Sequence, residues 1–166
     1  MVDASDPDAP DYVLTPDDAL RSARTVWTLL LVSMPVYALA AIAWPIPEGW
    51  EAAEHASWTV VGIFAGLGTV TLAAVPLMRR WLFFGPRDRG ELQEDPQEYL
   101  GALRTMSAAT WAMATSLAIY GLFAYFAVFQ LWVFALFFIP AGALFFIFRP
   151  PVELVHEVRP SSPYEQ

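Results

Sequence analysis

The chain has 166 residues, 57% of them hydrophobic, and its 17 acidic and nine basic residues give a net charge of −8. The absence of cysteine excludes disulfides and thiolate-held metals, and the acidic balance argues against nucleic acid as a partner. Charged residues lie outside or at the edges of four apolar blocks, as expected where a charge at mid-bilayer costs at least about 2.5 kcal/mol. We therefore predict an all-α integral membrane four-helix bundle over residues 15–149, between a disordered acidic tail (1–14) and a loose C-terminal tail (150–166).

The first membrane helix has a recognisable start. Thr15 is predicted to be its N-cap, with Pro16 at the first helical position and Asp18 at the capping-box position. The span covers about residues 25–44, and about 20 helical residues match the thickness of a hydrocarbon core. Pro35 lies inside this span and removes one backbone hydrogen bond, which predicts a kink.

The second span covers about residues 57–78 and follows an acidic connection. We interpret the polar side chains of this connection as a solvated loop rather than a metal site: Glu48, Glu51, Glu54 and His55. The span contains a stripe of small residues, and such stripes let two helix backbones approach closely in lipid. The stripe predicts a close contact, within the bundle or between protomers, and consists of Gly62, Gly66, Thr69 and Ala73.

The third helix is expected to start at Asp95 or Pro96 and to cross over about residues 105–127, and the fourth span covers about residues 131–148. One uninterrupted helix across both spans would be about 66 Å long, twice the bilayer. We therefore predict a turn at Phe129–Gln130. A second packing stripe in the third span consists of Ala108, Ala112 and Thr115.

The basic residues predict the orientation of the chain. Arg21 and Arg24 precede the first span, five arginines lie between spans two and three, and Arg149 follows span four. The other two connections contain no arginine. The positive-inside rule then places both termini in the cytoplasm, with the protein in the cell membrane. All nine basic residues are arginine, and an acidic chain without lysine is typical of a halophilic or GC-rich source.

Two helix starts 80 residues apart share a pattern. Residues 15–25 and 95–105 each contain a capping residue, a proline, and then leucine, arginine and threonine at matching positions. We interpret the pattern as a duplicated two-span hairpin. Because each copy has an even number of crossings, the two hairpins have the same, parallel orientation.

The four spans contain no Asp, Glu, Lys or His. A proton relay or ion-coupled carrier normally needs such a group, and a haem needs an axial ligand inside the bundle. No nucleophile–base pair or metal cluster is recognisable either, so we predict no enzyme activity, no metal and no cofactor. Hydroxyls within the spans are interpreted as contacts between helices. The alternative is a polar lining formed by Ser33, Tyr37, Thr115, Ser116 and Tyr120.

The segment Ala114–Leu122, which reads Ala-Thr-Ser-Leu-Ala-Ile-Tyr-Gly-Leu, resembles the ion-carrying helix of proteolipid (c-type) subunits of rotary ATPases. That family has a glutamate five residues before Tyr-Gly-Leu, glycine-rich partner helices and a form with two fused hairpins. The resemblance implies a fold of helical hairpins that pack through small residues. It does not imply ion translocation, because Thr115 occupies the glutamate position and cannot exchange a proton.

These observations predict a non-catalytic polytopic membrane protein that acts as a structural or accessory subunit. Its expected partners are the lipid bilayer and either another membrane protein or further copies of itself. The alternative is a small passive channel or carrier with a hydroxyl-lined path, in a monomer or an oligomer.

Overall fold

The computed structural model describes residues 15–45, 54–92 and 95–156, including all side chains in these ranges except those of residues 54–57 and 156. This part of the chain is helical and contains no strand. Four helices are long and apolar enough to cross a membrane, which confirms the all-α, four-span prediction. The elements are α1 (Pro16–Ala43), α2 (Glu54–Arg79), the π-helix η2 (Arg80–Phe84), α3 (Gly85–Asp88), α4 (Pro96–Val128), α5 (Leu131–Ile147) and α6 (Val152–His156).

α1 and α4 begin as the sequence predicted. The Thr15 hydroxyl accepts from the Asp18 backbone N–H at 3.2 Å and donates to the Asp18 carboxylate at 2.6 Å. At the start of α4 the Asp95 carboxylate accepts from the Gln97 N–H at 2.8 Å. In both helices a proline follows the cap, at a position where no N–H donor is needed. The two starts are built alike, whereas their origin by duplication stays a prediction.

A two-residue turn separates the third and fourth membrane helices. α4 ends at Val128, and Phe129 takes a left-handed conformation with φ of 50°. Gln130 then precedes α5, and its side-chain oxygen accepts from the Trp132 indole N–H at 2.6 Å. A left-handed residue is a common way to end a helix, although glycine usually occupies it. The predicted turn at Phe129–Gln130 is confirmed.

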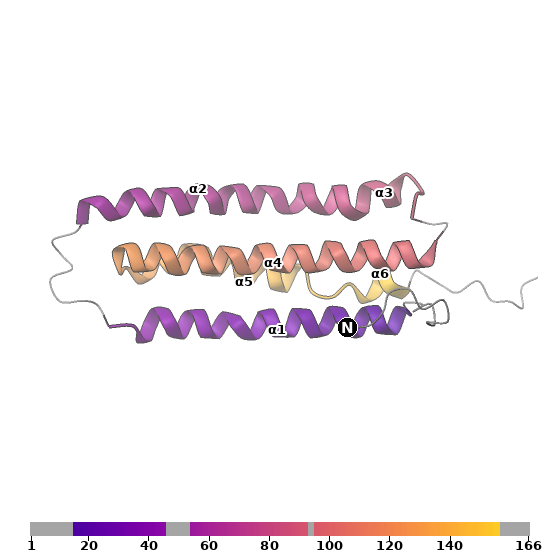
Figure 1. Cartoon of the computed structure of the whole chain (residues 1–166), viewed down its shortest axis with the longest axis horizontal. Helices are drawn as coiled ribbons and strands as arrows, with labels where there is room; N and C mark the ends of the chain where they lie inside the picture. The colour runs from indigo at the N-terminus through magenta and orange to yellow at the C-terminus, as the bar shows by residue number, and fades with distance from the viewer. Residues whose placement is uncertain (1–14, 46–53, 93–94, 157–166) are drawn as a thin grey trace, which may run out of the picture.

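α4 is the central helix. It lies between α2 and α1, with α5 behind it in the view of Figure 1, and it contacts all three. α1 and α2 share little or no contact, so the first predicted hairpin is not a packed pair, whereas α4 and α5 form a close one. Ten residues separate Ala43 from Glu54. They can extend over about 33 Å, more than the roughly 20 Å between helices on opposite flanks of a third.

The segment after α5 forms the short helix α6, which contacts α1. Val155 is buried there, and the Tyr99 hydroxyl of α4 donates to the Leu154 carbonyl oxygen at 3.2 Å. α5 has 17 residues and α4 has 33, which correspond to about 26 and 50 Å. α6 packs beside α4 beyond the end of α5. Residues 152–156 are therefore helical and packed, whereas the sequence predicted a loose tail from residue 150. The tails at 1–14 and 157–166 lie outside the described residues.

Two tryptophans bind the end of α5. The Trp111 indole N–H donates to the Phe148 carbonyl oxygen at 2.6 Å, and the Trp27 indole N–H donates to the Phe145 carbonyl oxygen at 3.2 Å. Carbonyl groups at a helix C-terminus lack partners within the helix, so these indoles satisfy them. Trp111 is fully buried, and α4 supplies more of the core residues than any other helix. The core therefore runs along α4, with the end of α5 held between α1 and α4.

The two ends of the bundle carry different side chains. The start of α1, the end of α2, the start of α4 and α6 lie together on the right of Figure 1, and the described arginines belong to this end. The opposite end has aromatic pairs, with ring centroids 5.9 Å apart for Trp58 and Trp132 and 5.5 Å apart for Trp44 and Phe126. Trp27 and Trp81 lie close to the arginines in the chain, and arginine at one interface with aromatic residues at both is typical of membrane helices.

Candidate functional site

The small-residue stripe of α2 faces away from the bundle. A Cβ atom built on Gly62 or Gly66 would meet nothing within 4 Å, and Thr69 and Ala73 are exposed. The glycine that packs is Gly68, whose Cβ would lie 3.0 Å from the Phe137 ring of α5. Gly68 is two residues from Gly66, which is about 200° around the helix. The stripe is therefore not a contact within the bundle, and a contact with another chain stays a prediction.

The stripe of α4 is divided between the core and the surface. Thr115 is buried, and its hydroxyl donates to the Trp111 carbonyl oxygen at 3.0 Å. Ala108 is half-buried and Ala112 is exposed. These two alanines line an open groove of about 610 Å³, which we call the α4 groove. Its lining consists of Gly101, Arg104, Thr105, Ala108, Ala109 and Ala112.

The α4 groove opens on the side of α4 that α5 does not cover. Gly121 marks the face toward α5, because its Cβ would lie 2.7 Å from the Phe137 Cβ atom. Ala112 lies nine residues before Gly121, about 180° around the helix. α1 and α2 pack on the two flanks of α4. The lining belongs to α4 alone, so the groove is a shallow strip on the open side of this helix, with small side chains beside Arg104.

The structure does not bring the predicted hydroxyl lining together. Tyr37 packs in the clusters that α1 forms with α4 and α5, whereas Tyr120 lies against Phe64 of α2, with ring centroids 5.9 Å apart. The Ser33 hydroxyl donates to the Leu30 carbonyl oxygen at 2.6 Å. The Ser116 hydroxyl bonds back to its own helix in the same way. The two serine hydroxyls therefore bond within their own helices, and a hydroxyl-lined path stays a prediction.

Arg79, at the end of α2, is a site that the sequence did not single out. Its guanidinium carbon lies 4.1 Å from the ring centroid of Phe148 and 5.6 Å from that of Phe84. One guanidinium nitrogen lies 3.5 Å from the Thr110 hydroxyl oxygen of α4. The charge thus sits between two aromatic rings and ties the ends of α2 and α5 to α4. Its neighbour Arg80 is exposed, and the sequence alone does not distinguish the two arginines.

An exposed ion pair lies beyond the end of α3. Arg89 Nε lies 2.5 Å and Arg89 Nη2 lies 3.0 Å from the two carboxylate oxygens of Glu91. The hydrogen bonds from Arg89 lower the pKa of the Glu91 carboxyl, and those to Glu91 raise the pKa of the guanidinium. Among the described side chains no group of three His, Asp or Glu is placed to hold a metal ion. The side chains of Glu48, Glu51, Glu54 and His55 lie outside the described set.

Comparison with known proteins gives no relative: no family model, no curated protein and no solved structure matches the chain. The resemblance to proteolipid subunits at Ala114–Leu122 therefore stays a prediction.

Proposed function

We propose that this chain is a non-catalytic multi-pass membrane protein that acts as an accessory subunit and packs against a helix of another membrane protein. The observation that carries the proposal is the α4 groove. It is an uncovered strip of small side chains on the helix that is otherwise the most enclosed one.

The α4 groove favours the end of a transmembrane helix as its occupant, because Ala112 and Ala108 lie about 24 and 30 Å from Val128 along α4, within a hydrocarbon core of about 30 Å, and Gly101 lies beyond it. Lipid tails are as apolar as leucine, so helices associate in a bilayer through close packing and hydrogen bonds rather than through hydrophobicity. Gly101, Ala108 and Ala112 allow a backbone to approach α4, and the Thr105 hydroxyl, which donates to the Gly101 carbonyl oxygen at 2.9 Å, stays satisfied within α4. The exposed glycines of α2 offer a second small-residue face to the same partner complex.

We place both termini in the cytoplasm and the protein in the cell membrane. The support is the gathering of arginines at one end of the four helices, since cytoplasmic ends carry the excess of basic residues.

Site-specific photocrosslinking tests the proposal, and a chain without cysteine allows a single labelling site. Ala112→Cys labelled with benzophenone maleimide in native membranes should give one protein adduct of defined mass. Ile139→Cys is the matched control, because Ile139 is 68% exposed on α5 but lies outside the groove. It should give no such adduct.

Two results would contradict the proposal. The first is that both positions give only lipid adducts and the protein purifies as a lone monomer in mild detergent. The groove would then contact lipid rather than a partner protein. An adduct with twice the mass of the chain would assign the groove to a second copy and would contradict the accessory role.

A further inference from the structure

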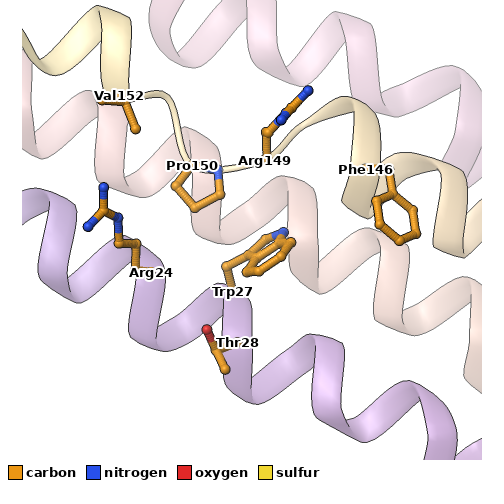
Figure 2. A pocket seen from close by; sticks show the side chains of 7 residues that line it. All are labelled: Arg24, Trp27, Thr28, Phe146, Arg149, Pro150 and Val152. Atoms are coloured by element: carbon orange, nitrogen blue, oxygen red, sulfur yellow. The ribbon is translucent and has the colours of Figure 1, made fainter.

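A second cavity, of about 580 Å³, lies at the arginine-rich end between α1 and the segment that follows α5. Figure 2 shows Arg24 and Arg149 on either side of Pro150, with their guanidinium groups pointing apart, Trp27 below Pro150 and Phe146 to the right of Arg149. The Trp27 ring is held in place by its hydrogen bond to the Phe145 carbonyl oxygen at 3.2 Å. The volume is within the range of about 300–1,000 Å³ typical of small-molecule sites. We call this space the Arg24–Arg149 cavity.

The lining of this cavity is divided into a charged rim and an apolar floor. Arg24 and Arg149 are exposed, and no carboxylate of the described residues forms an ion pair with either. The remaining lining comes from Trp27, Thr28, Phe146, Pro150 and Val152. Two positive charges above an aromatic and aliphatic surface match a ligand that has an anionic group joined to an apolar chain.

The position of the cavity along the bundle selects one source for such a ligand. Arg24 lies 20 residues before Trp44 on α1, about 30 Å along the helix, and Arg149 lies 17 residues after Trp132, about 26 Å. Trp44 and Trp132 are at the opposite, aromatic end. A hydrocarbon core is about 30 Å thick, so both guanidinium groups lie at the level of lipid headgroups when the tryptophans occupy the other interface.

We propose that the Arg24–Arg149 cavity binds the phosphate of an anionic phospholipid. The two exposed guanidinium groups, which point apart in the unbound protein, turn toward the phosphate on binding, and an acyl chain lies along Trp27, Thr28 and Phe146. This site goes beyond the proposed docking role and lies on a different surface from the α4 groove. A bound lipid would cover the junction where α5 ends and the short helix α6 begins.

Native mass spectrometry of the full chain in a non-ionic detergent tests the site. The probes are phosphatidylglycerol and phosphatidylcholine with the same acyl chains. We expect one phosphatidylglycerol to bind in preference to phosphatidylcholine. Arg24→Gln and Arg149→Gln should each weaken phosphatidylglycerol binding about fivefold, and the double variant about 30-fold. Arg80→Gln, at an exposed arginine of the same end outside the cavity, should change binding less than twofold.

Thr28→Trp fills the cavity but keeps both arginines, and it should also weaken phosphatidylglycerol binding. Equal weakening by Arg80→Gln, or no effect of Thr28→Trp, would overturn the proposal, since the lipid would then be attracted by the basic end as a whole. Glycerol 3-phosphate in excess should not displace the lipid. Complete displacement would assign the cavity to a soluble phosphate ester and would overturn the lipid assignment.

Discussion

α4 and α2 are both long enough to cross a bilayer, but they are buried to very different extents. Half of the most apolar window of α4 is buried, against 11% of that of α2, although α4 is the less apolar helix of the two. In a water-soluble protein the opposite order would be expected, because the more apolar helix would lie inside. Apolarity therefore does not decide which of these helices is at the centre.

The difference follows from the solvent that surrounds each helix. Hydrocarbon does not drive apolar side chains inward, so close packing and the shielding of polar groups determine which face is buried. All the buried polar residues of the described part belong to α4, namely Ser107, Thr110 and Thr115. α4 also carries Gly121, at its closest approach to α5. The features that distinguish the central helix are therefore its buried hydroxyls, the buried indole of Trp111 and the close approach at Gly121.

The largest expected effect comes from removing a buried side chain of α4. Trp111→Ala should lower the free energy of unfolding by about 3–5 kcal/mol, because it creates a cavity and removes the hydrogen bond to Phe148. Leu77→Ala on α2, at a residue that is 70% exposed, should have almost no effect. Thermal unfolding of both variants in detergent measures the difference. Equal losses would show that α4 is no more central than α2.

Alanine at two glycines provides a matched pair on the same two helices. Gly121→Ala should destabilise the protein by about 1–3 kcal/mol, since its Cβ would lie 2.7 Å from that of Phe137. Gly62→Ala should be neutral or stabilise by up to about 1 kcal/mol, since its Cβ meets nothing and alanine is the better helix former. Thermal unfolding of the monodisperse fraction of each variant in detergent measures the two effects. A destabilising Gly62→Ala would contradict the outward direction of the α2 stripe.

Arg79 links α2 to the polar interior of α4. Arg79→Met should cost about 1–2 kcal/mol, because the contacts of the charge with the two aromatic rings are lost. Arg80→Met, at the exposed neighbour, is the control and should be close to neutral. Unfolding by denaturant in mixed micelles measures both. If Arg80→Met has the larger effect, the tie between α2 and α4 is not made by Arg79.

The smallest effect is expected at Glu91, in the connection between α2 and α4. Its carboxyl pKa is lowered by Arg89, so the ion pair stabilises the fold above the unfolded-state pKa, and this stabilisation is lost as the pH falls through the lowered pKa. The pair is exposed and its contribution is small. Glu91→Gln should melt slightly lower than the parent at pH 7, and the two should coincide at pH 2. A difference that grows in acid would contradict this sign.

The sequence predicted the parts of the fold that depend on local chemistry. Thr15 and Asp95 are caps because their side chains bind nearby backbone N–H groups, and that geometry needs no tertiary contact. The turn at Phe129–Gln130 followed from length, because one helix through both spans is too long for a bilayer.

The faces of the helices were less predictable. Gly62 and Gly66 have the spacing of a packing motif, but Gly68 is the glycine that contacts α5. The spacing does not identify the packed face, because small residues can face either lipid or a neighbouring helix. α6 was missed because its signal is not local: only the shortness of α5 leaves room for Val155 to be buried.

The short turn between α4 and α5 has a consequence for how the chain enters the membrane. Phe129 and Gln130 carry no charge, so this pair of helices can move into the bilayer together without carrying an ion through hydrocarbon. The connection between α1 and α2 contains two glutamates and Glu54 begins α2, and all three must cross if both termini stay in the cytoplasm. With both termini in the cytoplasm, we expect the first half of the protein to depend on the insertion machinery of the cell more than the second half does.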